Sequence, residues 1–363
     1  MVRPVSVLSI ATAVPPHVVE QAEVARIAPA VFSGMFERHP CIGDVFVHAG
    51  IERRNMARPI EWLIAPHDWS DRTEAYLDVA GALFLAAARE ALARAGLEAG
   101  AVDTVVTVSS TGIATPSLDA RLARALGLRA DVARVPVFGL GCAGGVTGLG
   151  LAARLARGAP GKIVLMVAVE LCTLAVRFDR GNKTDVVAAA LFADGAAAAV
   201  LRADEHNSGV VRLGHGAEHM WPDTLDIMGW TVDPVGFGVV LSPGLPRFLE
   251  ERLAEPASAF VDRLDCPAKP HFICHLGSGK VLAAIETALD LPADTLASER
   301  AVLRQHGNMS SPSVLFVLDH ALARGITGPA VLAALGPGFT ASFLGAELGQ
   351  GSGRESGRES GNG

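Results

Sequence analysis

One stretch, residues 135–158 (VPVFGLGCAGGVTGLGLAARLARG), constrains the fold more than any other part of the chain. It starts with a short β-prone run, crosses a cluster of glycines around Cys142, and continues with apolar residues at helical spacing up to Gly158. The pattern predicts a strand, a tight turn and a buried helix, with Cys142 at the helix N-terminus. Glycines allow a sharp bend, and the unpaired N–H groups of a helix start favour a thiolate. The stretch favours a nucleophilic cysteine and leaves a buried structural cysteine as the alternative.

The composition argues against several classes of protein. The chain has 363 residues, 50% of them hydrophobic and 5% aromatic, enough for two ordinary domains or one large duplicated one. A net charge of -7 without a long basic run argues against a nucleic-acid partner. Glu170 and Asp194 interrupt the longest apolar runs, so no membrane span is expected. Five scattered cysteines without zinc-type spacing predict a reducing, cytoplasmic setting and no metal site.

Strand-like apolar runs alternate with helix-like segments, which predicts an α/β layered core. Residues 193–195 are expected to form a tight turn, and residues 215–240 an irregular segment. A coarse strand–helix rhythm in residues 1–208 recurs in residues 209–348, which hints at two similar halves. Residues 349–363, rich in Gly and Ser with a doubled GRES, are predicted to be a disordered tail.

Three further features could serve a cysteine nucleophile, which needs a base or cationic partner and often an oxyanion donor. His275 ends a short apolar strand, so its ring could project into a cleft; a satisfied core histidine is the alternative. Asn308 follows Gly307 where a helix is expected to start, and an N-cap role is its alternative. The adjacent Arg53 and Arg54 could bind a phosphate-bearing ligand or simply form a solvated surface.

Together these segments resemble the type III polyketide synthases, the chalcone-synthase-like branch of the thiolase superfamily, in a bacterial form. The match is carried by GCAGGVTGL around Cys142, by His275 with LGSG, and by GNMSSPSVLFVLD around Asn308. TGIATPSLDARL, ALFADGAAA and ALGPGF extend it over residues 1–348. The resemblance implies an α/β, thiolase-like five-layered αβαβα fold and a homodimer. Residues 1–208 would form the half with the nucleophile, and residues 209–348 the half with His and Asn.

The resemblance also implies a role for each member of a Cys142–His275–Asn308 triad. Cys142 would hold an acyl starter as a thioester, and His275 would stabilise its thiolate. His275 and Asn308 would bind malonyl-CoA and stabilise the enolate left by decarboxylation. The enolate would then attack the thioester in a Claisen condensation. Coenzyme A thioesters would be the substrates, with no further cofactor.

Further residues acquire expected roles through the same resemblance. Phe192 and Phe237 correspond to two gatekeeping phenylalanines, although from the residues alone core packing is the alternative for both. Thr115, Cys172 and Ser310 are expected around the cavity. Thr115 is also expected to cross the dimer interface into the partner's cavity.

The resemblance also suggests contacts for coenzyme A, and the sequence departs from the plant members of the family at several positions. Arg53, Arg54 and Lys280 are the expected contacts for the coenzyme A phosphates. Leu276-Gly277 stands where plant members usually have proline and glycine, and Cys172 where threonine is frequent. These departures argue against a p-coumaroyl starter and a naringenin-type product.

The small and aliphatic expected cavity residues, with few aromatic rings, favour an aliphatic acyl-CoA starter, since each buried methylene adds about 0.8 kcal/mol. The expected products are alkylpyrones or alkylresorcinols. Malonyl-only phenols of the phloroglucinol or tetrahydroxynaphthalene type, and chalcone-like products, are alternatives. Two more distant alternatives share the fold: the initiating β-ketoacyl-ACP synthase of fatty-acid synthesis, which would show a His-Gln-Ala-Asn motif, and an inactive acyl-binding subunit.

Overall fold

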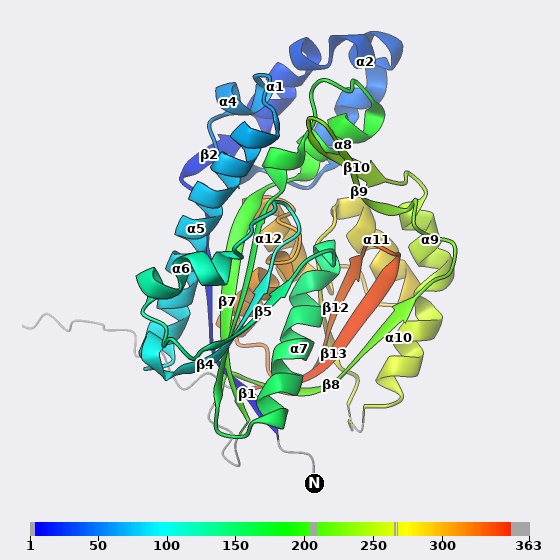
Figure 1. Ribbon diagram of the computed structural model, residues 1–363. Helices are drawn as coiled ribbons and strands as arrows, with labels where there is room; N and C mark the ends of the chain where they lie inside the picture. The colour runs from blue at the N-terminus through cyan, green and yellow to red at the C-terminus, as the bar shows by residue number, and fades with distance from the viewer. Residues whose placement is uncertain (1–3, 204–208, 265, 267, 350–363) are drawn as a thin grey trace, which may run out of the picture.

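A nine-stranded mixed sheet, in the order β11-β12-β13-β8-β1-β7-β6-β4-β5, is the frame of the molecule (Figure 1). The computed structural model describes residues 4–203, 209–264, 266 and 268–349. β6 and β7 are buried along almost their whole length, which explains their continuous apolar sequence. The strands of this sheet are β1 (Val5–Ala13), β4 (Val102–Val108), β5 (Ala133–Val137), β6 (Ile163–Leu171), β7 (Asp194–Ala203), β8 (Val211–Met220), β11 (His271–Cys274), β12 (Gly328–Gly336) and β13 (Thr340–Leu348).

The sheet repeats one topology. In the first half, β1 pairs antiparallel with β7, β7 antiparallel with β6, and β6 parallel with β4. In the second half, β8, β13, β12 and β11 pair in the same order and with the same senses. Pairing of β1 with β8 joins the halves, and β5 extends the first half by one strand. The expected boundary at residue 208 and all but the first residue of the expected tail, residues 349–363, lie outside the described residues, so both stay predictions.

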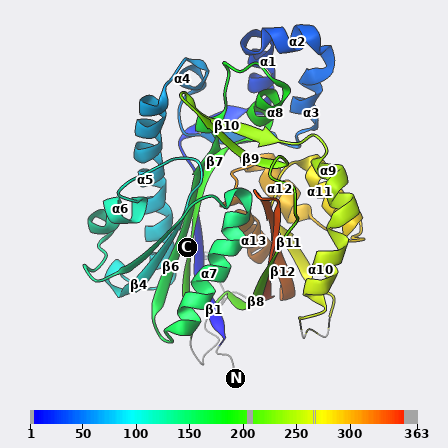
Figure 2. The ribbon, with the colours of Figure 1, turned by 45° about the vertical axis from the view of Figure 1, so that its right-hand side comes forward.

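Helices lie between the two halves of the sheet and over their outer faces. α7 (Gly144–Gly158) packs on strands of both halves, and α13 (Ser313–Ala323) packs against α7, β1, β7 and β11. α5 (Trp69–Arg94) covers the first half, and α10 (Ala254–Val261) lies against β13 (Figures 1 and 2). This is the five-layered thiolase-like arrangement, with α7 and α13 as its central layer.

The remaining elements flank this core, and several of them lie towards the top of Figure 1. Among the described residues, no helix is both long and apolar enough to cross a membrane. These elements are β2 (His17–Glu20), α1 (Gln21–Val31), α2 (Ser33–Arg38), α3 (Asp44–His48), β3 (Arg53–Met56), α4 (Ile60–Ile64), α6 (Leu118–Leu126), α8 (Lys183–Leu191), β9 (Met228–Asp233), β10 (Gly236–Leu241), α9 (Leu245–Arg252), α11 (Gly279–Ala288) and α12 (Ala297–His306).

Two segments differ from the sequence-based expectation. Asp194 and Gly195 begin β7 and form no tight turn, because the Asp194 carboxylate accepts backbone N–H bonds from Ala57 and Thr173 in the interior. The expected irregular segment 215–240 instead contains most of β8 and the β9–β10 hairpin. Interspersed glycines and prolines hide the strand alternation of that segment.

Candidate active site

One cavity brings together the three residues that the motifs single out. Cys142, His275 and Asn308 all line a space of about 790 Å³, together with Cys172 and Ser310. The triad residues come from the turn before α7, the end of β11 and the segment before α13. Residues from both halves of the sheet therefore line this one cavity.

Cys142 lies in a single 3-10 turn, Gly141–Ala143 (η3), that leads directly into α7. Gly141 has a φ of 48°, and a Cβ there would lie 2.7 Å from the ring of Pro337, so this position requires glycine. A Cβ on Gly145 would lie 2.2 Å from the carbonyl oxygen of Ser311. The glycines around Cys142 thus let the starts of the two central helices touch.

The Cys142 thiol is held in a largely apolar environment. Burial raises its pKa to about 11, and the nearby Glu170 carboxylate also raises it. The Ser310 hydroxyl, 3.4 Å from the Cys142 sulfur, donates a hydrogen bond and opposes this shift. Burial therefore works against the thiolate that a helix N-terminus favours.

His275 follows β11 and is held by its backbone N–H, which donates to the carbonyl oxygen of Ala333 at 2.8 Å. Its ring is buried, and Nδ1 has no hydrogen-bond partner among the described residues. Burial lowers the pKa of the imidazole to about 4, so the ring is neutral at pH 7. Burial of both groups opposes a charged pair in the resting state, and the expected stabilisation of a Cys142 thiolate by His275 stays a prediction.

Asn308 is fixed by both its side chain and its backbone. Nδ2 donates to the carbonyl oxygen of Gly277 at 3.0 Å, and Oδ1 accepts from the Ser310 N–H at 2.9 Å. Its backbone forms an isolated parallel bridge with Phe192. The helix α13 begins only at Ser313, so the alternative of an N-cap role for Asn308 is wrong.

The aromatic wall of the cavity differs in part from the expectation. Phe192 lines the cavity, whereas Phe237 is absent from its described lining and packs on Trp69 and Trp230, with ring centroids 5.0 and 6.0 Å apart. Trp230 lines the cavity and meets Phe192 edge-to-face at 6.1 Å. Sequence reasoning missed Trp230 because the alternation of Met228 and Trp230 in β9 was read as irregular.

The other expected pocket residues divide in the same way. Cys172 and Ser310 line the cavity. Thr115 is exposed and is not part of the described lining of its own chain's cavity. Its expected reach into a partner's cavity stays a prediction.

The two adjacent arginines point to opposite sides of β3, as successive strand residues do. Arg53 is exposed, whereas Arg54 is fully buried and donates from Nη1 to the Phe192 carbonyl oxygen at 2.9 Å. Burial lowers the pKa of Arg54 to about 10, against the attraction of Asp194. A buried guanidinium cannot reach a phosphate at the surface, so the expected coenzyme A contact is wrong for Arg54. Lys280 is exposed in the first turn of α11, beside cavity residues.

Comparison with known proteins agrees with this architecture. Residues 69–205 match the family model of the N-terminal domain of chalcone and stilbene synthases, and residues 212–344 match that of the C-terminal domain. The chain is 39% identical over 350 residues to a 1,3,6,8-tetrahydroxynaphthalene synthase of Streptomyces peucetius subsp. caesius, covering 94% of this chain and 93% of the relative. It is 30% identical over 308 residues to a phloroglucinol synthase of Pseudomonas fluorescens, covering 82% and 86%.

A solved structure gives the same result. The crystal structure of 1,3,6,8-tetrahydroxynaphthalene synthase from Streptomyces coelicolor A3(2), a bacterial type III polyketide synthase, matches with a TM-score of 0.88 at 27% identity. The match covers 94% of this chain and 99% of that one. The expected family and fold are confirmed. The chain belongs to the chalcone and stilbene synthase family and is a type III polyketide synthase, an acyltransferase.

Proposed function

We propose that this synthase loads an aliphatic acyl group from coenzyme A onto Cys142, extends it with malonyl-CoA, and forms alkylpyrones or alkylresorcinols. The observation that carries this proposal is the wall of the catalytic cavity, whose described lining holds no lysine or arginine. An alkyl group gains about 0.8 kcal/mol per buried methylene there, whereas a charged starter would lack a counter-ion. The apolar lining comprises Leu191, Phe192, Met228, Trp230, Val239, Val240, Leu241, Leu245, Val281, Leu335 and Pro337.

In the proposed loading step, His275 accepts the thiol proton as the Cys142 sulfur attacks the carbonyl carbon of acyl-CoA. The new carbon–sulfur bond forms, the bond to the coenzyme A sulfur breaks, and the proton passes to the departing thiolate. In this proposal both groups are neutral at rest, as burial favours, so the proton moves during the attack. The Ser310 hydroxyl, already bonded to the Cys142 sulfur, stabilises its developing charge.

In the proposed extension step, His275 and Asn308 donate to the thioester oxygen of malonyl-CoA. Asn308 uses one amide N–H for Gly277, so its second N–H is available to the substrate. Carbon dioxide leaves by breaking the bond to the malonyl methylene, and the electron pair remains as an enolate whose oxygen the two donors stabilise. The enolate carbon attacks the thioester and releases the Cys142 thiolate, giving a chain two carbons longer on coenzyme A.

A second candidate is a synthase that uses malonyl-CoA as starter and extender and forms phenols. It is supported by the relatives named 1,3,6,8-tetrahydroxynaphthalene synthase and phloroglucinol synthase. The rings of Phe192 and Trp230 in the cavity wall also suit a flat aromatic product.

The proposal includes a coenzyme A site and an assembly. Arg53 and Lys280 are exposed cations proposed to contact the coenzyme A phosphates. We expect Arg53→Ala to raise KM for starter and extender a few-fold, with a weaker effect at high salt; an unchanged KM would remove Arg53 from this site. The enzyme is proposed to work in the cytoplasm as a homodimer with Thr115 at the interface, on coenzyme A thioesters without another cofactor.

A starter panel tests the proposal. The enzyme is given malonyl-CoA with acetyl-, hexanoyl-, octanoyl-, decanoyl- or p-coumaroyl-CoA, or malonyl-CoA alone, and products are identified by mass spectrometry. We expect kcat/KM to rise from acetyl- to octanoyl-CoA. A phenol formed efficiently from malonyl-CoA alone would establish the second candidate, and a preference for p-coumaroyl-CoA would establish a chalcone-like activity.

A further inference from the structure

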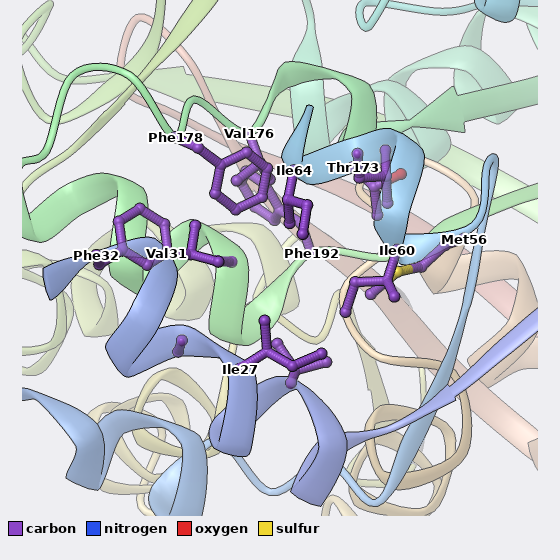
Figure 3. Close-up of a pocket in the computed structure, with 14 residues that line it drawn as sticks. Ile27, Val31, Phe32, Met56, Ile60, Ile64, Thr173, Val176, Phe178 and Phe192 are labelled. Carbon is purple, nitrogen blue, oxygen red and sulfur yellow. The ribbon is translucent and has the colours of Figure 1, made fainter. Parts of the chain in front are cut away.

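A second apolar cavity, of about 470 Å³, lies beside the catalytic cavity (Figure 3). Side chains of α1, β3, α4, α8 and the segment after β6 converge on it, and Thr173 alone is polar among the described lining residues. The lining consists of Val24, Ile27, Ala28, Val31, Phe32, Met56, Ile60, Leu63, Ile64, Thr173, Val176, Phe178, Ala189 and Phe192.

A thin partition separates the two cavities. Phe192 belongs to the described lining of both. Next to it, Cys172 lines the catalytic cavity and the adjacent Thr173 lines the second one. Val176 of the second cavity packs in one small cluster with Val239 of the catalytic cavity. A chain leaving the catalytic cavity here therefore passes only one layer of side chains.

Hydrogen bonds fix the backbone of Phe192, whereas its ring is held only by packing against apolar and aromatic neighbours. The Phe192 N–H donates to the Ala188 carbonyl oxygen, and its own carbonyl accepts from Arg54, both at 2.9 Å. The parallel bridge to Asn308 holds the residues on either side. The ring is half-buried and meets only the edge of Trp230 among the described aromatic rings. A rotation about χ1 would thus open the partition without moving Asn308.

We propose that the second cavity binds the distal part of the alkyl chain of the acyl group on Cys142, with the Phe192 ring as the gate. This inference rests on the proposed aliphatic starter. The occupant is an alkyl chain because the wall is apolar and the cavity adjoins the one that holds the acyl-carrying sulfur. Val31, Ile64 and Phe178 also line a neighbouring surface groove, which offers a longer chain a path out of the second cavity.

Three substitutions on α1 test the assignment. Ala28→Leu fills the second cavity, and Ile27→Ala enlarges it, since both residues line it. Ala22→Leu is the matched control, because Ala22 is exposed on the same helix. Without malonyl-CoA, intact-protein mass spectrometry follows loading of Cys142 by acetyl-, decanoyl- and dodecanoyl-CoA. The ratio of the decanoyl to the acetyl rate cancels any general loss of active enzyme.

We expect Ala28→Leu to lower the decanoyl-to-acetyl ratio roughly tenfold, the loss for about two methylenes that are no longer buried. Ile27→Ala raises the dodecanoyl-to-acetyl ratio, and Ala22→Leu keeps the wild-type ratios. If wild type loads decanoyl-CoA and neither cavity variant changes the ratios, the cavity assignment is overturned while the aliphatic starter stands. If wild type loads acetyl-CoA but not decanoyl-CoA, the proposed starter class fails and this inference fails with it.

Discussion

The two halves of the sheet share a topology but contribute different chemistry. α7 and α13 hold equivalent places, each leading into the strand that pairs antiparallel with the last strand of its half. Yet the turn before α7 carries Cys142, the proposed nucleophile, while the segment before α13 carries Asn308 and Ser310. The two halves therefore share a framework, and they differ in the candidate active-site residues that precede their central helices.

The segments added to this frame differ as well. In the second half, the β9–β10 hairpin supplies much of the wall of the catalytic cavity. In the first half, α1 and α4 wall the second cavity. The comparison teaches that the sites are set by what each half adds to the repeat. Four predictions test this difference between the two halves, in order of decreasing expected effect.

The largest expected effect follows loss of the first half's nucleophile. Cys142→Ala should lower polyketide formation by roughly 10⁴-fold or more, because no thioester can form on the enzyme. Cys274→Ala, in the buried strand β11 of the second half, is the matched control and should retain most activity. Both are measured as kcat with acyl-CoA and malonyl-CoA. Continued elongation by Cys142→Ala would remove Cys142 from its role.

Asn308, in the second half, should affect decarboxylation of malonyl-CoA and leave acyl loading intact. Asn308→Ala should keep acyl loading but lower decarboxylation of malonyl-CoA on the order of 10²–10³-fold, since one oxyanion donor is lost. Asn308→Asp keeps the acceptor for the Ser310 N–H and separates this loss from a local rearrangement. Loading is followed by protein mass and decarboxylation by release of carbon dioxide. Equal losses in both steps would indicate a structural role.

Burial of the Cys142 thiol should be visible in the pH dependence of its alkylation. A pKa of Cys142 raised to about 11 means that the thiolate fraction grows tenfold per pH unit below that value. The iodoacetamide rate at Cys142 should therefore rise about 100-fold from pH 7 to pH 9. The exposed Cys41 is the internal reference. A plateau of the Cys142 rate below pH 7 would point to a thiolate–imidazolium pair in the resting enzyme.

The contact between the two central helices should be sensitive to a single methyl group. Gly145→Ala places a Cβ against the Ser311 carbonyl oxygen and should destabilise the fold by about 1–3 kcal/mol. Gly150→Ala lies on the same helix, where a Cβ would have its nearest neighbour at 3.8 Å, and should stabilise it by about 0.5–1 kcal/mol. Urea unfolding measures both, and equal signs would contradict the helix contact.

Much of the frame and the triad could be predicted from the sequence because their signals are local. Glycines mark the turn at Cys142, and an apolar run ending in a polar residue marks His275. The Asp194-Gly195 pair misled because the dipeptide favours turns, whereas distant backbone groups hold this aspartate in the interior. Local patterns do not reveal which chain segments fold over a residue.

Arg53 and Arg54 illustrate the same limit. Two adjacent arginines suggested one cationic surface, but a strand places them on opposite faces. The short strand β3 was not expected, so the period-2 rule was not applied to it. Likewise, the role of the β9–β10 hairpin and Trp230 depends on tertiary packing that brings residues 228–241 over the cavity.

The bridge between Phe192 and Asn308 has a consequence for how chain-length preference can change. Leu191 and Ala193 share backbone hydrogen bonds with Asn308, so the Phe192 backbone and Asn308, the proposed oxyanion donor, are held together. Substitutions that displace the Phe192 backbone would alter extension along with starter choice. Selection for new starters is therefore expected to act first on α1 and α4, where the volume can be retuned while the catalytic residues stay in place.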